Sequence, residues 1–587
     1  MLGVKVSSVP HDLLKVVDWG KHASKSAVER FFPAHVRGTY KISYKDVEGK
    51  IKFLTLEQVI EGHHSEHRYW EALWSYSDKL STPAGRFRLE YDYWHWSNAD
   101  PFLVKVYGDI REWTRYERDE LAKSIIAVLE KYCDAEEQHK AFEEINDLLG
   151  DFPSDSRFPY TSLKTHHWLT DAIRRNETFW ARLSSARKLR GGEPTFNNLY
   201  IVRISISETQ FHRLKEIRGF IELREKILEI TKGRLSSFSP LQVGDDLYIV
   251  CLEENELKGI ISLLAETGFG FDVSVFEWSI TREERHVRVD RPEKIYIIKE
   301  AVERPQISIG AYESLDYSPE SSAEYSKILE GDYEYVAWIS IQPKGDMKEL
   351  SQKFLEWGES ELKSRYAGRR RGLKEPVREP TALLSPEIAL SIAEGYDEFL
   401  EDCAKMINPI NPQKSIVTKS FSRTILIRGL NEPSEALQTY NGITNLKTKL
   451  HIPIVFSIVV AKPKYPFWRI LELFRHNANY LIFIVGEKMS ELTDKHARLI
   501  ESVIQDIRNE RKRQFYKIVN SARKDSKEIL KVKINGLASE NKLRKETASK
   551  LCKIVDEIAR ESSGDENKRK RITYEVFKIL RMFASAR

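Results

Sequence analysis

Histidines and aspartates in the first eighty residues could together bind a divalent metal ion. The set comprises His11-Asp12, then Lys15 and His22, and further on His63, His64, His67 and Asp78. Imidazole and carboxylate groups are typical ligands of Mn²⁺, Fe²⁺, Co²⁺ and Ni²⁺ in hydrolytic sites. A metal held in this way lowers the pKa of a bound water and generates hydroxide near neutral pH. A chance His-Asp pair and a solvated loop over 62–67 remain the alternative.

The middle of the chain contains one pattern of strands and helices twice. The first copy, from Asn198 to about Ile280, reads strand, helix, two strands of a hairpin, helix, strand. The second copy starts at Tyr333 and follows the same order after an insertion. Strand periodicity and helical periodicity repeated in one order predict two βαββαβ domains, the ferredoxin-like arrangement of a palm domain. In a palm, carboxylates on the first strand and the central hairpin can hold two metal ions for nucleotidyl transfer.

The first copy offers only part of such a metal site. Gly244-Asp245-Asp246 lies at the predicted hairpin, but the first strand presents Arg203, Ser205 and Ser207, and Glu208 follows one position later. We therefore consider Gly244, Asp245 and Asp246 a candidate nucleotide-binding corner. A tight turn that uses Gly and Asp for their backbone preferences is the alternative.

The second copy lacks acids at the corresponding places. Gln342 and Lys344 occupy the first strand, Asp346 lies two residues further on, and the hairpin corner has no acid. That corner reads Ser420, Phe421, Ser422 and Arg423. Two-metal phosphoryl chemistry needs carboxylate ligands, so this copy is predicted to be inactive in nucleotidyl transfer.

Composition and charge limit the number of domains and the classes of protein that fit this sequence. The chain has 587 residues, a formal net charge of +5 and four cysteines far apart in sequence, which predicts several domains and no local zinc ribbon or disulfide framework. Residues 501–550 hold 14 Lys and Arg against 7 Asp and Glu. An excess of this kind is typical of contact with nucleic-acid phosphates, although a solvated helical face is the alternative. No apolar run suggests a membrane span or signal peptide, so we expect a cytoplasmic protein.

These features divide the chain into five regions. We predict an α+β multidomain protein with a mainly helical HD-like domain over 1–190, a first palm over 191–290, a linker over 291–330, a second palm over 331–490 and a basic helical domain over 491–587. The second palm contains a basic insertion with Arg369, Arg370 and Arg371. We expect this insertion and the residues Arg511, Lys512 and Arg513 to bind nucleic acid.

In this order, the regions resemble the large subunit of type III CRISPR effector complexes, the HD–palm or "Cas ten" family. HDLLKVVDWGKHASKSAVERFF is similar to that family's opening HD segment, and ALWSYSDKLSTP to the closing helix of the HD domain. VGDDLYIVCLEENEL and PIVFSIVVAKPKYPFWRILELF resemble parts of the first and second palms. The family's second palm usually carries a GGDD hairpin that makes cyclic oligoadenylate, which this sequence lacks. It therefore resembles branches with an inactive polymerase domain, and the type I-D large subunit is a close alternative.

The resemblance implies a function and a set of site residues. It implies metal-dependent cleavage of single-stranded DNA, with His11 and Asp12 as catalytic residues. The ligands of the divalent ion (Mn, Ni, Co or Mg) would be His11, Asp12, His63, His64 and Asp78. It also implies CRISPR RNA, target RNA or DNA and smaller effector subunits as partners, rather than a homo-oligomer or a membrane. A purely structural subunit of the same complex, or a less expected active cyclase, is the alternative.

Overall fold

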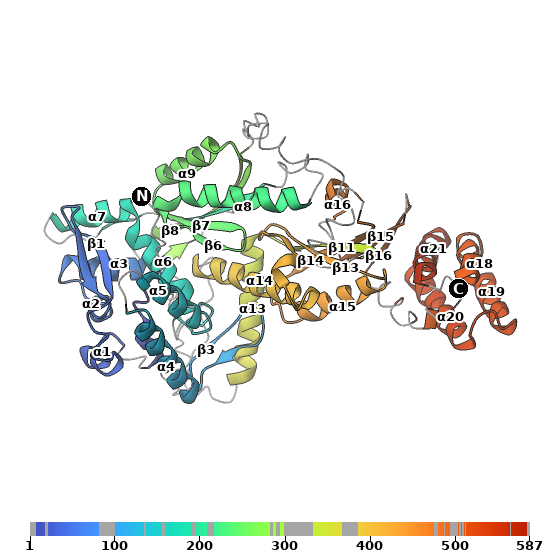
Figure 1. Ribbon diagram of the computed structural model, residues 1–587, viewed down its shortest axis with the longest axis horizontal. Coiled ribbons are helices and arrows are strands. Elements are labelled where there is room, and N and C mark those ends of the chain that lie inside the picture. The colour runs from blue at the N-terminus through green and yellow to red at the C-terminus, as the bar shows by residue number, and fades with distance from the viewer. Residues whose placement is uncertain are drawn as a thin grey trace.

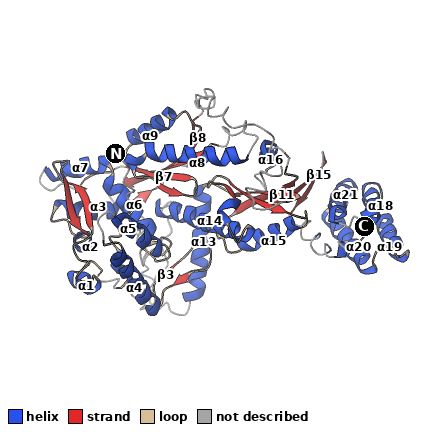
Figure 2. Ribbon diagram, in the orientation of Figure 1, coloured by secondary structure: helices blue, strands red, loops and turns tan. Residues whose placement is uncertain are grey.

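The protein is described from a computed structural model (Figure 1). The described residues are 8–17, 22–81, 100–133, 137–154, 159–188, 194–196, 198–207, 217–281, 286–288, 294–298, 333–366, 386–463, 465, 467–474, 479–485, 488–493, 500, 503, 506–507, 510, 512–563 and 565–583. Figure 2 shows two strand-rich regions side by side in the middle of the molecule, with the N-terminal helices at one end and a helical bundle at the other. The predicted α+β multidomain class is confirmed.

The N-terminal region is mainly helical but contains two short hairpins. The hairpins pair β1 (Lys41–Lys45) with β2 (Ile51–Thr55) and β3 (Phe102–Leu103) with β4 (Arg111–Glu112). The helical elements are η1 (Leu13–Val16), α1 (Lys25–Phe31), α2 (Leu56–Gly62), α3 (Tyr69–Ser81), α4 (Arg115–Lys131), α5 (Gln138–Leu148), α6 (Leu163–Arg175) and α7 (Glu177–Lys188). Capping boxes begin α2 at Thr55 and α4 at Thr114, which satisfies backbone donors that the first helical turn leaves open.

The first palm has the predicted βαββαβ order. It consists of β5 (Asn198–Ile206), α8 (Ile217–Arg234), the short η4 (Ser236–Phe238), β6 (Leu241–Val243), β7 (Asp246–Cys251), α9 (Glu254–Glu266) and β8 (Phe271–Thr281). The strands lie in the order β10-β8-β5-β7-β6, and the four palm strands pair antiparallel. The strands β9 (His286–Arg288) and β10 (Lys294–Ile298) extend this sheet beyond β8. β10 therefore places a strand within the stretch predicted as a linker.

The second palm repeats this topology. It consists of β11 (Tyr335–Pro343), α13 (Met347–Tyr366), an additional helix α14 (Pro386–Ile407), η6 (Pro412–Ser415), β12 (Ile416–Lys419), β13 (Thr424–Leu430), α15 (Glu435–Lys447) and β14 (Ile454–Ala461). The order β12-β13-β11-β14 is equivalent to β6-β7-β5-β8 of the first palm. The sheet continues through β15 (Tyr480–Val485) and β16 (Lys488–Thr493), and α16 (Phe467–Leu473) precedes them.

Alternation along the strands of the palms explains how the domains join. On β5, Leu199 and Ile201 belong to one hydrophobic cluster, whereas Tyr200 and Val202 belong to another. The first cluster also contains Leu169 of α6 and residues of α14. Because successive side chains of a strand point to opposite faces, the first palm sheet packs against its own helices on one side and against the N-terminal region and α14 on the other.

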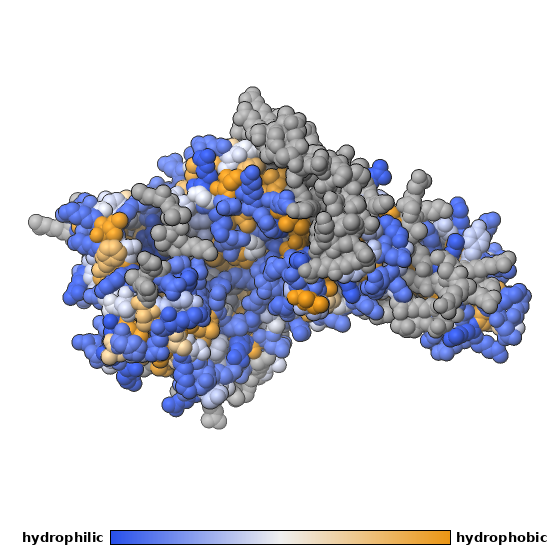
Figure 3. All heavy atoms as spheres, viewed as in Figure 1, coloured by the Kyte–Doolittle hydropathy of each residue, from blue (hydrophilic) through white to orange (hydrophobic). Residues whose placement is uncertain are grey.

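The C-terminal region is a bundle of α18 (Lys512–Lys524), α19 (Lys527–Ser539), α20 (Lys545–Glu561) and α21 (Glu566–Phe583). Buried side chains such as Phe515, Leu551 and Phe577 join these helices. Figure 3 shows mainly hydrophilic side chains over the part of the bundle that faces the viewer and is drawn in colour. Among the helices that the structure describes, none combines the length and apolarity needed to cross a bilayer.

Candidate metal centre

Four segments far apart in the sequence bring imidazole and carboxylate groups together inside the N-terminal region. His11 and Asp12 lie in the turn before η1, and both are completely buried. His63 follows the last residue of α2, Asp78 lies in α3, and His166 lies in α6. These elements pack around Trp74 and the aliphatic residues of η1 and α2, so the centre is built on a rigid hydrophobic core.

The ligand atoms form two groups that share Asp12. His11, Asp12, Asp78 and His166 each place one such atom within 4.8 Å of the others. A second group, under the same limit, consists of Asp12, His22, His63 and His64. Asp12 presents Oδ2 to the first group, 3.3 Å from His166 Nε2, and Oδ1 to the second, 3.0 Å from His63 Nε2. A carboxylate that faces two groups of ligands is suited to bridge two metal ions.

Hydrogen bonds fix the orientation of the imidazole rings. Nδ1 of His11 faces the carbonyl oxygen of Val9 at 3.4 Å, and Nδ1 of His63 faces that of Ile60 at 2.7 Å. Nδ1 of His166 lies 3.1 Å from Oε1 of Glu387. Each of these contacts requires Nδ1 to carry the proton, which leaves the lone pair of Nε2 directed into the centre, as metal-binding histidines require.

The buried atoms that meet in the centre fit a cation. His11 Nε2, Asp12 Oδ1, His63 Nε2 and His166 Nε2 make no hydrogen bond to any described residue. Unsatisfied buried polar atoms are costly, and metal ions bound in the two ligand groups would together satisfy all four. A site made only of imidazole nitrogen and carboxylate oxygen favours Mn²⁺, Fe²⁺, Co²⁺ or Ni²⁺.

The pKa values also reveal a demand for positive charge. Burial alone would raise the pKa of Asp12, but Lys15 and the imidazoles of His166, His22 and His63 lower it well below its usual range. Burial would lower the pKa of His166, yet the carboxylates around it raise that pKa well above its ordinary value. His166 is thus surrounded by negative charge, which a cation bound in the centre would offset.

The structure brings together most of the predicted ligands and adds some. His11, Asp12, His63, His64 and Asp78 all lie in the two groups, and His22 joins the second. His67 lies outside both groups. His166 and Glu387 were not recognised from the sequence. The adjacent His166-His167 in an amphipathic segment was a possible signal, but nothing in the sequence linked it to residues 150 positions earlier.

His167 has a structural role beside the metal centre. Its Nδ1 lies 2.8 Å from Oδ1 of Asn146, and its Nε2 accepts a hydrogen bond from the backbone N–H of Asp12 at 3.2 Å. Both ring nitrogens are thus engaged. Burial lowers the pKa of His167 well below its ordinary value, so the ring is neutral, and it holds the His11-Asp12 turn in place.

The Gly244-Asp245-Asp246 corner forms a junction between the two palms. The N–H of Asp245 donates to the carbonyl oxygen of Lys419 at 2.9 Å, and its Oδ2 accepts from Arg224 at 3.0 Å. Thr418 Oγ1 and the N–H of Lys419 also donate to Oδ2 of Asp245. Gly244 has φ of +59°, and a Cβ there would lie 2.2 Å from the Lys419 carbonyl oxygen. These features fit the alternative of a tight turn, and within the described residues neither aspartate belongs to a group of possible metal ligands.

The second palm contributes its acid-free hairpin to the same junction. The N–H of Phe421 donates to Oδ2 of Asp246 at 2.8 Å, and the guanidinium of Arg203 lies 5.0 Å from the centre of the Phe421 ring. Arg203 also donates to Ser274 at 2.8 Å. Asp346, the nearest acid after β11, accepts a hydrogen bond from the N–H of Glu349 at the start of α13. It therefore acts as a helix cap.

Comparison with known proteins identifies the fold. No protein-family model matches the chain, and no curated protein matches its sequence. Among solved structures, Csm1 in T. onnurineus aligns with a TM-score of 0.53 at 12% identity, over 98% of each chain. A chain of the Csm1–Csm4 cassette in complex with pppApApA aligns with a TM-score of 0.51 at 10% identity, again over 98% of both. The chain has the Csm1 fold. The predicted resemblance to the HD–palm large subunits is thus confirmed by fold.

The predicted nucleic-acid contacts remain predictions within this Csm1 fold. Arg369, Arg370, Arg371 and Arg511 lie outside the described residues, as does Glu208 of the first palm. Lys512 and Arg513 form the first turn of α18, but their side chains are also outside the described part.

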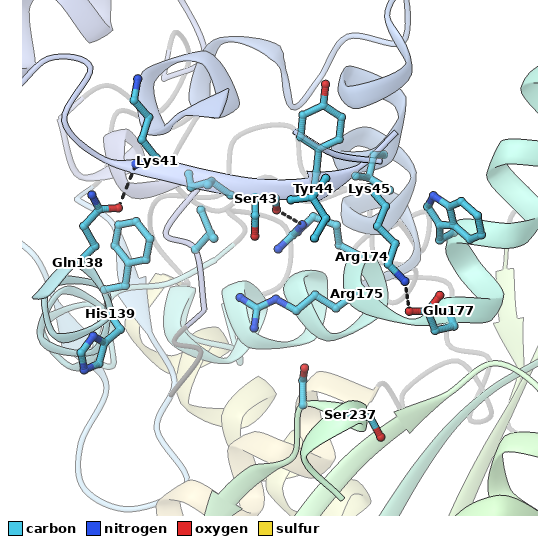
Figure 4. Close-up of a pocket in the computed structure, with 17 residues that line it drawn as sticks. Lys41, Ser43, Tyr44, Lys45, Gln138, His139, Arg174, Arg175, Glu177 and Ser237 are labelled. Carbon is cyan, nitrogen blue, oxygen red and sulfur yellow. Dashed lines mark hydrogen bonds and ion pairs between the residues drawn. The ribbon is translucent and has the colours of Figure 1, made fainter. Parts of the chain in front are cut away.

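A cavity of about 420 Å³ lies apart from the metal centre, between β1, α5, α6 and η4 (Figure 4). Its lining includes Lys41, Lys45 and Arg175, and the Arg175 side chain extends into it. Asp171 accepts from both Arg174, at 2.9 Å, and Arg175, at 2.5 Å, so one carboxylate serves two guanidinium groups. The positive lining would favour an anionic group, but no residue of the two ligand groups lines this cavity.

Proposed function

We propose that this protein is the large subunit of a type III CRISPR effector complex and that its metal centre cleaves single-stranded DNA. The observation that carries the proposal is the pair of ligand groups joined by Asp12. The Csm1 fold over nearly the whole chain supports the subunit role. Csm1 is the large subunit of type III-A complexes, and its structures include the partner Csm4. By this analogy, the partners would be smaller effector subunits, CRISPR RNA and its target, in the cytoplasm.

The residues of the centre would divide the work of hydrolysis. Two divalent ions would supply a hydroxide nucleophile and neutralise charge that develops on a phosphodiester. His11, Asp78 and His166 would hold one ion, and His22, His63 and His64 the other, with Asp12 between them. Lys15 donates to Asp12 Oδ2 at 2.5 Å and to the Ser154 carbonyl oxygen at 3.0 Å. Lys15 therefore fixes the carboxylate so that both of its oxygens keep facing the ligand groups.

We also propose that the palms make no cyclic oligoadenylate. The second palm presents Ser420, Phe421, Ser422 and Arg423 where carboxylates would be required. The two aspartates of the first palm engage backbone and side-chain donors of the second palm. Incubation of the purified protein with labelled ATP and Mg²⁺ should yield no oligoadenylate, and formation of such a product would overturn this part of the proposal.

The nuclease is tested with the purified protein, Mn²⁺ and labelled single-stranded DNA. We expect the wild type to cleave and the His11→Ala and Asp12→Ala variants to lose cleavage, because each variant removes a ligand of the centre. Asp346→Ala is the matched control, because Asp346 is an exposed helix cap that belongs to neither ligand group. Unchanged cleavage by the Asp12 variant would refute the nuclease, and intact metal binding without cleavage in the wild type would favour the purely structural subunit.

The subunit role needs a separate test. A tagged copy purified from its native host should retain smaller subunits and a small RNA of repeat-derived sequence. Recovery of the protein without RNA or other subunits would show that the likeness to Csm1 is architectural only.

A further inference from the structure

One ligand of the metal centre is supported by a residue from a different domain. His166 lies on α6 of the N-terminal region, and Glu387 lies in the first turn of α14, the additional helix of the second palm. His166 Nδ1 and Glu387 Oε1 are 3.1 Å apart, and the two residues are 0% and 1% exposed. Ser81 Oγ is farther from Nδ1, at 3.4 Å, and pairs with Thr170 at 2.7 Å.

We propose that Glu387 is a positioning residue that completes the metal centre from the second palm. This inference rests on the metal centre of the proposed function. Through Nδ1, Glu387 holds the His166 ring so that Nε2 faces Asp12 Oδ2 at 3.3 Å and Asp78 Oδ1 at 3.1 Å. The acceptors for His11 and His63 are backbone carbonyl groups of their own domain. A carboxylate acceptor both orients the ring and increases the electron density that Nε2 offers to a metal.

The burial of Glu387 argues for this role. Removing a carboxylate from water is costly unless a hydrogen bond or an opposite charge compensates it. Among the described residues, the polar contact recorded for the Glu387 side chain is the one with His166. The buried carboxylate at this position is therefore explained by the ring that it faces.

The same interface contains a second, structurally similar contact that provides a control. Thr165 precedes His166 on α6, and its hydroxyl donates to Oε2 of Glu394 at 2.6 Å, two turns along α14 from Glu387. Glu394 therefore links the same two helices without facing any ring of the ligand groups. Replacement of Glu394 tests the docking of α14, and replacement of Glu387 tests docking together with orientation of the ligand.

The experiment is a titration of the full-length metal-free protein with Mn²⁺, followed by calorimetry, and with Co²⁺, followed by its visible absorption. The wild type should bind two ions. Glu387→Ala should weaken the binding of one of these ions roughly 10- to 100-fold, the range typical for loss of a group that supports a ligand. The affected ion is the one held by His11, Asp78 and His166, so the other should keep its affinity. Glu387→Gln retains an uncharged acceptor and should weaken the binding of that ion less than Glu387→Ala does.

The control decides between orientation and docking. Glu394→Ala should lower the melting temperature but leave both Mn²⁺ affinities and the Co²⁺ spectrum unchanged. Equal losses of affinity in Glu394→Ala and Glu387→Ala would overturn the inference, as would wild-type affinity in Glu387→Ala. A wild type that binds no metal would instead refute the metal centre itself, so the two failures are distinguishable.

Discussion

The metal centre and the junction of the palms use similar buried acids in opposite ways. In the centre, Asp12 Oδ1 and the Nε2 atoms of His11, His63 and His166 have no hydrogen-bond partner among the described residues. In the junction, Oδ2 of Asp245 accepts from Arg224, from a hydroxyl and from a backbone N–H. The first arrangement leaves polar atoms that a cation would satisfy, whereas the Asp245 carboxylate of the second is satisfied by donors of the protein itself.

The comparison shows why an acidic motif is not sufficient evidence for chemistry. Gly244-Asp245-Asp246 has the composition of a catalytic corner, yet its polar groups hold one palm against the other. His11-Asp12 is an ordinary dipeptide in sequence, yet its side chains are members of the two groups of ligands. What distinguishes them is where the donors and acceptors point, which follows from tertiary structure.

The sharpest way to break this comparison is to remove one acid from each region. Asp12→Asn should weaken the binding of both Mn²⁺ ions by roughly a thousandfold or more, because Asp12 is shared by both sets of ligands. This loss of affinity exceeds the roughly 10- to 100-fold typical of groups that only support a ligand. Asp245→Asn should leave both affinities unchanged. Calorimetric titration of metal-free protein measures the two constants directly.

Thermal unfolding gives an independent check of the same contrast. Mn²⁺ at about 100 times its dissociation constant should add about 2.7 kcal/mol for each bound ion to the stability of the wild type and of Asp245→Asn. Asp12→Asn should show no such gain. A loss of metal binding in the Asp245 variant would place the first palm in the metal chemistry and contradict the comparison.

Much of the fold could be predicted from local patterns. The short, largely apolar runs along β5 and β11, followed by helical spacing, are sufficient to indicate both palms. The short hairpins of the N-terminal region and the strand β10 were missed, because brief strands give little periodicity and are stabilised by their neighbours in the sheet.

The site was predictable only where its residues are close in sequence. His11, Asp12, His63 and His64 lie in short polar segments that attract attention as ligands. His166 lies in a helix most of whose residues are buried, and its role depends on α6 packing against α3 and η1, which lie far earlier in the sequence. Such long-range contacts leave no local pattern, so the complete set of ligands required the structure.

A second test concerns stability rather than metal. Asp245→Ala should destabilise the fold by about 3–5 kcal/mol, because it leaves the largely buried guanidinium of Arg224 without its carboxylate. Asp346→Ala removes only an exposed helix cap and should cost about 1 kcal/mol. Chemical denaturation of metal-free protein measures both. Equal losses in the free energy of unfolding would mean that Asp245 in the junction stabilises the fold no more than the exposed helix cap Asp346 does.

The smallest effect concerns the proton on Asp246. Burial raises the pKa of Asp246 from its ordinary 3.8 to about 6, although Arg203 and the N–H of Phe421 oppose the shift. The folded protein thus holds this proton more tightly than the unfolded chain, so the contribution is fully present below about pH 4 and is lost as the pH rises through 6. The difference in pKa corresponds to about 3 kcal/mol.

Asp246→Asn isolates this contribution, because an asparagine keeps an acceptor for the Phe421 N–H but cannot ionise. Relative to the wild type, the free energy of unfolding of the variant should rise by about 3 kcal/mol between about pH 3 and pH 8. Asp46→Asn is the control of opposite sign, since the hydrogen bond from Lys52 lowers the pKa of Asp46. That variant should lose stability relative to the wild type as the pH rises towards 3.8, the ordinary pKa of the carboxyl, and the difference should be constant above it. A pH-independent difference for Asp246→Asn would show that the carboxylate is ionised in the junction at all these pH values, held by Arg203 as an ion pair rather than by a proton.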